Sequence, residues 1–314
     1  MDFHVADTLE KHDWVGGGFD AYVYHVTPMI VVKTVRHDRA PGEEAAEHPF
    51  LKEIVFYKRL NDCEDQSRHI IECFLMLSDH LFLSYCIYKA IAPRFYERQE
   101  RERGPNGFHG SLLKVKEYED PALHVEKLGF CHNDLHASNC LLDENLNLKL
   151  ADFGRATTIG KLLEGAQYGL CCARTGQFAV GTLLYFMVYG HEPYDEIILD
   201  AAVWDRRFGE MEFPELNRHE VFDGLISACW HNVYPTMTLV AYDFKRKTDG
   251  FALKAEYTLI NSAKEAKTCG ALVSKGLLGP ELALRFQPVW RGYLCGFMKR
   301  GVFVWQYFLR KFWS

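Results

Sequence analysis

The sequence lacks the features that mark secreted, membrane-spanning and nucleic-acid-binding proteins. No apolar run follows a basic start, because residues 1–14 carry four acidic side chains and one lysine, so we expect no signal peptide. The longest nearly uncharged apolar run covers 13 residues, 178–190. A bilayer needs about 20 apolar residues, so this run predicts a buried core helix instead. The net charge of −6 argues against a nucleic-acid binder, which needs a basic face to neutralise phosphates.

Paired cysteine motifs are also missing. The ten cysteines are scattered, none forms a CxxC pair, and Cys171 and Cys172 are adjacent, which is poor geometry for a disulfide or a zinc site. We therefore expect reduced thiols in a cytoplasmic protein, with a nuclear location left open. The 48% of apolar and 25% of charged residues are typical of a folded soluble chain. At 314 residues we expect about two domains or lobes.

The first part of the chain reads as short strands with one helix. Apolar residues at helical spacing predict a helix over 48–61. Runs rich in β-branched and aromatic residues predict four strands, at 22–26, 29–35, 70–77 and 81–86, with turns at Thr27-Pro28 and Ser78-Asp79. The stretch before the helix, residues 41–47, is a polar connector.

The rest of the chain is predicted to be mostly helical. A hairpin over 140–150, with its acidic turn, interrupts the helices. The alternating charges of 94–103 are typical of a solvated helix face or loop. Two helices are expected over 250–289, with a break at 276–280. A strand-rich first part followed by a helix-rich second part predicts an α+β protein in two lobes.

The chemistry concentrates in residues 128–156. Asp134 follows His132 by two residues, Asn139 follows Asp134 by five, and Asp152-Phe153-Gly154 begins thirteen residues after Asn139. The predicted hairpin between them would hold the two polar ends side by side. Phosphoryl transfer needs such a set: a carboxylate that orients the attacking hydroxyl, and an amide and a carboxylate that hold Mg²⁺ on the phosphates.

This segment resembles the catalytic and magnesium-binding loops of the protein-kinase superfamily. The resemblance implies that Asp134 is catalytic and that Asn139 and Asp152 bind the metal. Nearer the start, the stretch from Gly16 to Val23 resembles the family's glycine loop, with Gly16 and Gly18 as its first two glycines. Ala21 replaces the third glycine. The implied cofactors are ATP and Mg²⁺, with Gly16, Gly18, Ala21 and Val23 against the nucleotide.

Residues 30–33 match the strand of the family that ends in a lysine. The resemblance implies that Val31 contacts the nucleotide and that Lys33 grips the α- and β-phosphates. The implied partner of this lysine is Glu53, twenty residues on, on the predicted amphipathic helix. A lysine in a core strand is costly unless its ammonium has such a partner.

Later segments extend the resemblance over about residues 12–245. Residues 177–185 are similar to the buried central helix of the large lobe, 190–194 to the G-x-x-P-Y segment and 229–237 to the late C-W and R-P-T pattern. More narrowly, the chain is similar to divergent kinase-like proteins of filamentous fungi. The implied lobes are 1–86 and 87–248, with ATP in the cleft between them, followed by a helical extension over 249–314.

Several positions depart from the family pattern. Asn133 replaces an arginine that pairs with a phosphorylated activation loop, so we expect no such switch. Only 22 residues, 155–176, separate the D-F-G motif from the central helix, and they lack the A-P-E motif. In the family, the glutamate of A-P-E pairs with the arginine of the R-P-T motif. That arginine is absent too, since Tyr234 stands at its position. Gly176 replaces an aspartate that braces the catalytic loop. A remodelled large lobe is the expected result.

Two features leave alternatives open. His136 lies where many kinases have lysine or alanine, and the His-Asn-Asp-Leu-His motif is closer to aminoglycoside and choline kinases. It either contacts the transferred phosphate or is a loop histidine satisfied by hydrogen bonds. Residues 291–314 carry five basic and no acidic side chains, interleaved with aromatics. They form either a helix packed on the large lobe or a helix for a membrane surface or a partner.

The leading hypothesis is an ATP- and Mg²⁺-dependent kinase that phosphorylates Ser or Thr on a protein substrate, with no nucleic-acid partner and no transmembrane segment. One alternative is a small-molecule kinase, favoured by the motif around His136. The other is a pseudokinase scaffold, favoured by Gly176, Asn133 and the short activation segment. Asp134, Lys33, Asn139, Asp152 and Glu53 are all residue types competent for catalysis.

Overall fold

The computed structural model describes residues 8–37, 47–64, 67–88, 90–91, 121–161, 172–195, 201–248 and 258–285. The chain packs into two compact units, each made of separate segments of the sequence. The first unit comprises 1–44, 73–84 and 261–314, and the second comprises 45–72 and 85–260. The lobe boundaries expected from the sequence stay a prediction.

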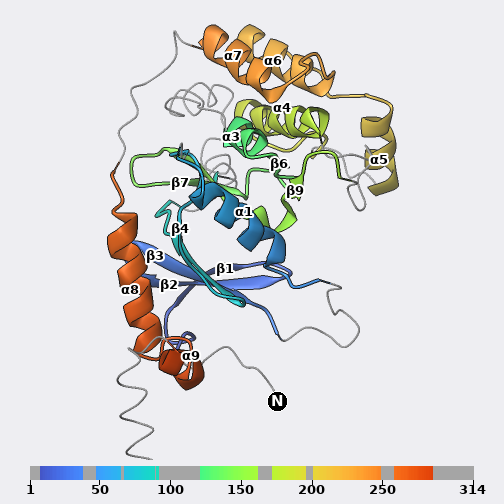
Figure 1. Cartoon of the computed structure of the whole chain (residues 1–314). Coiled ribbons are helices and arrows are strands. Elements are labelled where there is room, and N and C mark those ends of the chain that lie inside the picture. The colour runs from blue at the N-terminus through green and yellow to red at the C-terminus, as the bar shows by residue number, and fades with distance from the viewer. Residues whose placement is uncertain are drawn as a thin grey trace, which may run out of the picture. The chain divides into compact units, whose positions relative to one another are not determined.

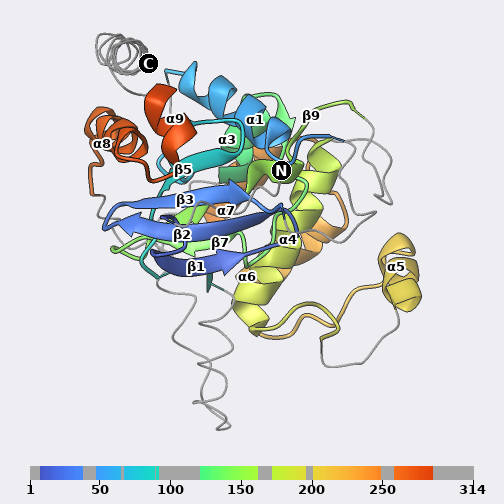
Figure 2. The same cartoon turned by 90° about the horizontal axis from the view of Figure 1, so that it is seen from below.

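An antiparallel sheet forms the centre of the first unit, and Figure 2 shows several of its strands side by side. The strand order is β1-β2-β3-β5-β4. The bounds are β1 Asp13–Gly17, β2 Ala21–Thr27, β3 Ile30–Val35, β4 Cys73–Met76 and β5 His80–Ser84. All four strands expected from the sequence are present, and both expected turns join them. The β-branched run of β3 is buried except at Lys33, which is partly exposed. This explains why the run is apolar up to that residue.

Two helices near the end of the described chain, α8 (Ser262–Ser274) and α9 (Pro280–Arg285), complete the first unit. The expected break between them is present. α8 contacts β4, a strand at the edge of the sheet (Figure 1). Its inward stripe has one residue per turn, Glu265, Cys269 and Val273, all buried. The Thr8 hydroxyl donates to the carbonyl of Leu277 over 2.7 Å, so the two ends of the described chain meet in this unit.

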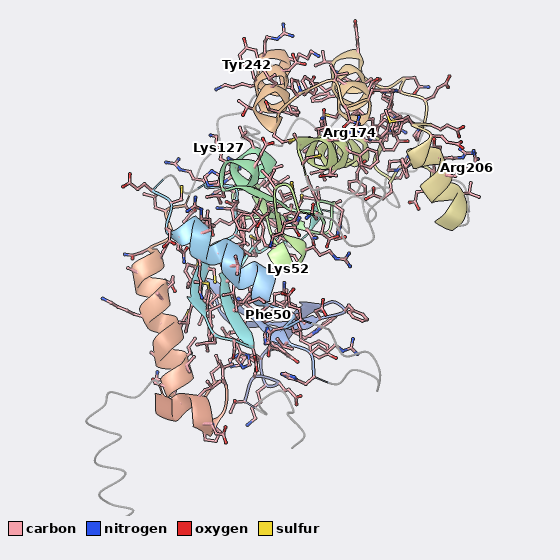
Figure 3. The ribbon with its side chains drawn as sticks, turned by 45° about the vertical axis from the view of Figure 1, so that its right-hand side comes forward. Phe50, Lys52, Lys127, Arg174, Arg206 and Tyr242 are labelled. Atoms are coloured by element: carbon pink, nitrogen blue, oxygen red, sulfur yellow. The ribbon has the colours of Figure 1, made fainter. Side chains whose placement is uncertain are left out.

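The second unit is mainly helical (Figure 1). Its helices are α1 Leu51–Asn61, α3 Pro121–Lys127, α4 Ala173–Tyr189, α5 Ala201–Gly209, α6 Glu220–Trp230 and α7 Met237–Thr248. Its short strands are β6 Phe130–Cys131, β7 Cys140–Leu142, β8 Leu148–Leu150 and β9 Thr157–Thr158, with the 3₁₀ turn η2 at Phe153–Arg155. The expected helix at 48–61, hairpin at 140–150 and core helix at 178–190 are all present. Figure 3 marks Lys127 at the end of α3 and Arg174 at the start of α4.

The core of the second unit forms where α4 packs on α6. Helix α4 buries most of its last ten residues, and Trp230 at the end of α6 is fully buried against it. The approach is close, because a Cβ on Gly181 would lie 2.8 Å from the Cβ of Cys229. Gly190 ends α4 in the left-handed conformation, with φ 84°.

Some expectations fall outside the described residues: most of the connector 41–47, the charged stretch 94–103, and the extension 291–314. Within the described part of the chain, no helix is long and apolar enough to cross a membrane. The cysteines in that part are all free thiols.

Candidate active site

The β7–β8 hairpin brings the polar ends of the sequence motif together. Cys140 pairs with Leu150 at the base of the hairpin, and the Ala151 N–H donates to the Asn139 carbonyl over 2.9 Å. Asn139 and Asp152 therefore lie on adjacent strand ends. The turn of the hairpin is fixed by Asp143, whose carboxylate accepts from the backbone N–H of Asn145 and of Asn147, each at 2.9 Å.

The catalytic-loop candidate Asp134 is held through one carboxylate oxygen. Its Oδ2 lies 3.3 Å from Nδ2 of Asn139, 3.7 Å from Nε2 of His136 and 3.9 Å from Nε of Arg155. Among the described residues, none reaches Oδ1. All the described protein contacts of this carboxylate are therefore on Oδ2, and the side chain is 32% exposed.

Asn139 shows a similar division. Its Nδ2 donates to the Asp134 carbonyl over 2.8 Å. Because a carbonyl can only accept, this contact fixes which amide atom is the nitrogen. Its Oδ1 has no donor among the residues that the structure describes. The residue is 9% exposed.

The charges around Asp134 favour its ionised form. Burial alone would raise the pKa of this carboxyl, but the neighbouring His136 imidazole and Arg155 guanidinium outweigh it, so its pKa lies below the ordinary value. The nearby Asp134 carboxylate raises the pKa of His136, while burial opposes it. Burial raises the pKa of nearby Glu192, against the effect of His136.

Asp152 occupies an unusual backbone conformation, with φ 62° and ψ 75°. Asp and Asn tolerate this left-handed region better than other residues with a Cβ. Its Oδ1 accepts from the Gly154 N–H over 3.4 Å, which caps η2. The chain then turns Phe153 into the core, where its ring stacks on Phe56 of α1 at a centroid distance of 3.8 Å. The same ring makes edge-to-face contacts with Tyr57 and His132.

His132 is a structural member of the site. Its Nδ1 accepts from the Asp134 N–H at 3.3 Å, and its Nε2 lies 3.0 Å from the Ala151 carbonyl. Because the ring accepts at Nδ1 and faces a carbonyl at Nε2, it is the neutral Nε2–H tautomer. Burial lowers its pKa to about 4, although Ala151 and the nearby carboxylates oppose the shift.

The structure adds two residues whose contacts the sequence did not indicate. Asn133 adopts φ 61° and donates from Nδ2 to the Arg155 carbonyl over 3.3 Å. It ties the catalytic loop to the segment after the D-F-G motif, and a left-handed position suits Asn. Arg155 brings a cation to Asp134. Its position directly after that motif was the only sequence signal for it.

The other predicted nucleotide-binding residues lie in the first unit. Gly16 and Gly18 have open space where a Cβ would be, whereas a Cβ on Gly17 would lie 3.0 Å from the Tyr22 ring. The Gly18 N–H donates to the Ala21 carbonyl over 2.9 Å, which closes the turn. Lys33 lies opposite Val23 in the β2–β3 register, and Val31 is buried.

Glu53 lies on α1 in the second unit and is fully buried, as are its helix neighbours Phe56 and Tyr57. A carboxylate at such a position on an amphipathic helix requires a polar or charged partner. The predicted pairing with Lys33 stays a prediction.

The departures from the family pattern have local compensations. Gly176 faces Met237, since a Cβ there would lie 3.3 Å from its sulfur. The Gln177 amide bonds both backbone groups of Tyr234, at 2.9 and 3.3 Å. The Tyr234 hydroxyl donates to Asp243 over 2.6 Å. Hydrogen bonds thus link α4 to the segment before α7, and that segment to Asp243 of α7.

The polar groups fit a magnesium–nucleotide complex. Mg²⁺ prefers oxygen ligands, and it usually takes one or two from protein and the rest from phosphates and water. Asn139 Oδ1 and the carboxylate of Asp152 are oxygen donors of this type, on adjacent strand ends. Within the described residues there is no cluster of three acidic, histidine or cysteine side chains.

An antiparallel small sheet, a catalytic-loop carboxylate and a D-F-G turn after a hairpin define a protein-kinase-like α+β fold. Curated relatives agree. Human NUAK family SNF1-like kinase 1 is 26% identical over 192 residues, and human tyrosine-protein kinase ABL2 is 27% identical over 253. The transforming protein Abl of Abelson murine leukemia virus, a tyrosine-protein kinase, is 31% identical over 252.

These matches cover 53%, 71% and 71% of the chain, respectively. They relate the chain to the protein-kinase superfamily and confirm the resemblance read from its motifs. No family model matches the chain. The chain spans 26%, 20% and 32% of the length of these three relatives, so the activity of any whole relative does not transfer to it directly.

Proposed function

We propose that the protein transfers the γ-phosphate of ATP to a hydroxyl group, as a Ser/Thr-type protein kinase that requires Mg²⁺. The observation that carries the proposal is the divided carboxylate of Asp134. Oδ2 lies near protein donors, while no described residue contacts Oδ1. A carboxylate of lowered pKa is ionised at neutral pH, and it can orient an acceptor hydroxyl and take its proton.

Each further residue has a role in this proposal. Asn139 Oδ1 and the carboxylate of Asp152 would hold Mg²⁺, which neutralises charge on the phosphates when bound. Lys33 would bind phosphate oxygens and Glu53 would orient it. The turn from Gly16 to Ala21 would lie against the phosphates through its backbone N–H groups, and Val23 and Val31 would contact the base.

The proposed acceptor is a Ser or Thr hydroxyl. One curated relative is described as a putative serine/threonine-protein kinase/receptor and others as tyrosine kinases. The proposal keeps the Ser/Thr acceptor of the sequence hypothesis, and phosphoamino-acid analysis of the labelled product distinguishes it from Tyr. A protein is the proposed substrate.

The test combines nucleotide binding with turnover. We expect ATP with Mg²⁺ to raise the melting temperature of the full chain, since a ligand at 100 times its Kd stabilises the folded state by about 2.7 kcal/mol. Asp134→Asn should keep this shift but lower phosphate transfer from MgATP by roughly 10²–10⁴-fold, because only the proton acceptor is lost.

Asp62→Asn is the matched control, because Asp62 is exposed at the end of α1 and should leave both readouts unchanged. No thermal shift at millimolar MgATP would reject an ATP-dependent function. A shift without turnover on protein and metabolite acceptors would instead identify a binding scaffold. Turnover on an aminoglycoside or choline and not on protein would identify a small-molecule kinase.

A further inference from the structure

Two cysteines that are 41 residues apart in the sequence, Cys131 and Cys172, meet beside the candidate site. The Cys131 thiol donates to the Cys172 carbonyl over 3.7 Å. Cys131 ends β6, which pairs with β9 and contacts α4 (Figure 1). Cys172 is the N-cap of α4. One thiol is therefore directed at the backbone of the other cysteine, at a point where three segments of the second unit pack together.

The backbone of Cys172 is held in place by the first turn of α4. The Thr175 hydroxyl donates to the Cys172 carbonyl over 2.8 Å and accepts from the Cys172 N–H over 3.4 Å. The Gly176 N–H donates to the same carbonyl over 3.3 Å. The group that faces the Cys131 thiol is thus fixed by the helix, so the two cysteines are adjacent without a covalent bond.

The two thiols differ in exposure. Cys131 is 8% exposed, whereas Cys172 is partly exposed. Cysteines that act as redox sensors are accessible to solvent and often lie next to a resolving thiol, which condenses with the oxidised one to a disulfide. Cys140 is different, because burial raises the pKa of its thiol to about 12, and structural buried thiols are inert. The arrangement of Cys172 and Cys131 is that of a sensor with a resolving thiol behind it.

We propose that Cys172 and Cys131 are a modification site for hydrogen peroxide, at which they form a reversible disulfide. Peroxide oxidises the Cys172 thiolate to a sulfenic acid, and hydroxide leaves. The Cys131 thiol then attacks that sulfur, the S–S bond forms and water leaves. The net reaction turns two thiols and one peroxide into one disulfide and two waters, and a small thiol reverses it by exchange.

The disulfide would act on the catalytic loop through the residue that precedes it. Cys131 is followed by His132, whose ring accepts from the Asp134 N–H over 3.3 Å. In a disulfide the two sulfurs are bonded to each other, so the Cys131 sulfur must leave the carbonyl that it now faces. A shift of about 1 Å at a supporting residue can lower a rate about 100-fold. We therefore expect the oxidised form to be less active, and this consequence, unlike the disulfide itself, rests on the proposed function.

Mass spectrometry of the full chain detects the disulfide directly. The reduced protein is treated with hydrogen peroxide, blocked with N-ethylmaleimide and digested without reductant. We expect a Cys131–Cys172 cross-link in the wild type and in Cys171→Ser. Cys140→Ser is the matched control and should keep the cross-link, because Cys140 is buried and lies in the same tryptic peptide as Cys131, residues 128–149. Cys172→Ser should abolish it, and α4 should stay intact because serine is a favourable N-cap.

Turnover of MgATP is measured on the same samples before oxidation, after it, and after reduction with dithiothreitol. We expect oxidation to lower the wild-type rate by roughly 10–100-fold and dithiothreitol to restore it. Cys172→Ser should keep the basal rate and lose the sensitivity to peroxide.

The outcomes separate the disulfide from its consequence. If no cross-link forms, or if it persists in Cys172→Ser through another thiol, the inference is wrong whatever the activity. A cross-linked wild type with its full rate would overturn the effect on the catalytic loop, while the proposed function stands. If the reduced protein does not turn over MgATP, the proposed function fails and the effect on the loop fails with it, while the mass spectrum still decides whether the disulfide forms.

Discussion

At the scale of single residues, polar side chains of the candidate site are arranged so that one atom is held and no described residue contacts another. Asp134 and Asn139 both follow this rule, and both are held by short-range contacts within the loop. Backbone strain accompanies the arrangement, since Asn133 and Asp152 both have positive φ. Strained residues persist only where the surroundings fix them, and they concentrate at functional sites.

The buried imidazole of His132 predicts a pH-dependent stability. Its pKa is about 4 in the folded chain against an ordinary 6.5, so between these values the unfolded chain binds a proton that the folded chain does not. Its contribution is therefore complete above pH 6.5 and is lost as the pH falls toward 4, by about 3 kcal/mol in total.

Urea unfolding of the wild type and of His132→Gln at pH 7.5 and pH 4.5 measures this contribution. The stability difference between the two pH values should be smaller in the variant. His231→Gln should keep the wild-type difference, because that ring is exposed. An equal pH dependence in all three proteins would contradict the assignment of His132 as a buried neutral ring.

At the scale of elements, the contact of α4 with α6 forms the core of the second unit. Gly181 is the point of closest approach, with Cys229, Trp230 and the Ile226 carbonyl around it. The Trp230 indole also donates to the Thr182 hydroxyl over 3.2 Å, which fixes the register of the two helices.

Gly181→Ala should destabilise the protein despite the better helix propensity of alanine. The added Cβ would lie 2.8 Å from the Cβ of Cys229 and 3.0 Å from Trp230, so the helices must separate. Overpacking of this kind costs about 1–3 kcal/mol, measured by chemical denaturation.

Gly224→Ala on α6 is the matched control, because no atom lies within 4 Å of its Cβ position. It should be neutral or should stabilise the chain by up to about 1 kcal/mol. A Gly181→Ala protein as stable as Gly224→Ala would show that the two helices are not so closely packed.

At the scale of the whole molecule, each unit is assembled from distant parts of the sequence. The first unit joins the N-terminal strands to α8 and α9. The second joins α1 to the D-F-G turn, where Phe56 stacks on Phe153. Helix α8 is thus part of the packing of the small sheet, since it contacts the edge strand β4.

Val273→Asp tests this assembly. Val273 is fully buried in the inward stripe of α8, and a carboxylate buried there without a partner costs several kcal/mol. We expect a large fall in melting temperature and loss of hydrogen-exchange protection in β4 and β5. Ala271→Asp, two residues away on the exposed face of the same helix, should have little effect. Equal melting temperatures for the two variants would mean that α8 is not packed on the sheet.

The sequence alone predicted the main strands and helices and the relationship to the protein-kinase superfamily. Strands, hairpin and core helix follow from local periodicity and turn residues, and the spacing from His132 to Gly154 determined the resemblance to kinases, which the relatives support. Tertiary structure decided which atoms meet. Sequence spacing cannot show that Oδ2 of Asp134 faces His136 and Arg155, that Asn133 reaches across to the Arg155 carbonyl, or that α8 returns to the small sheet. These contacts depend on side-chain orientation and on packing between residues far apart in the chain, so local sequence patterns do not predict them.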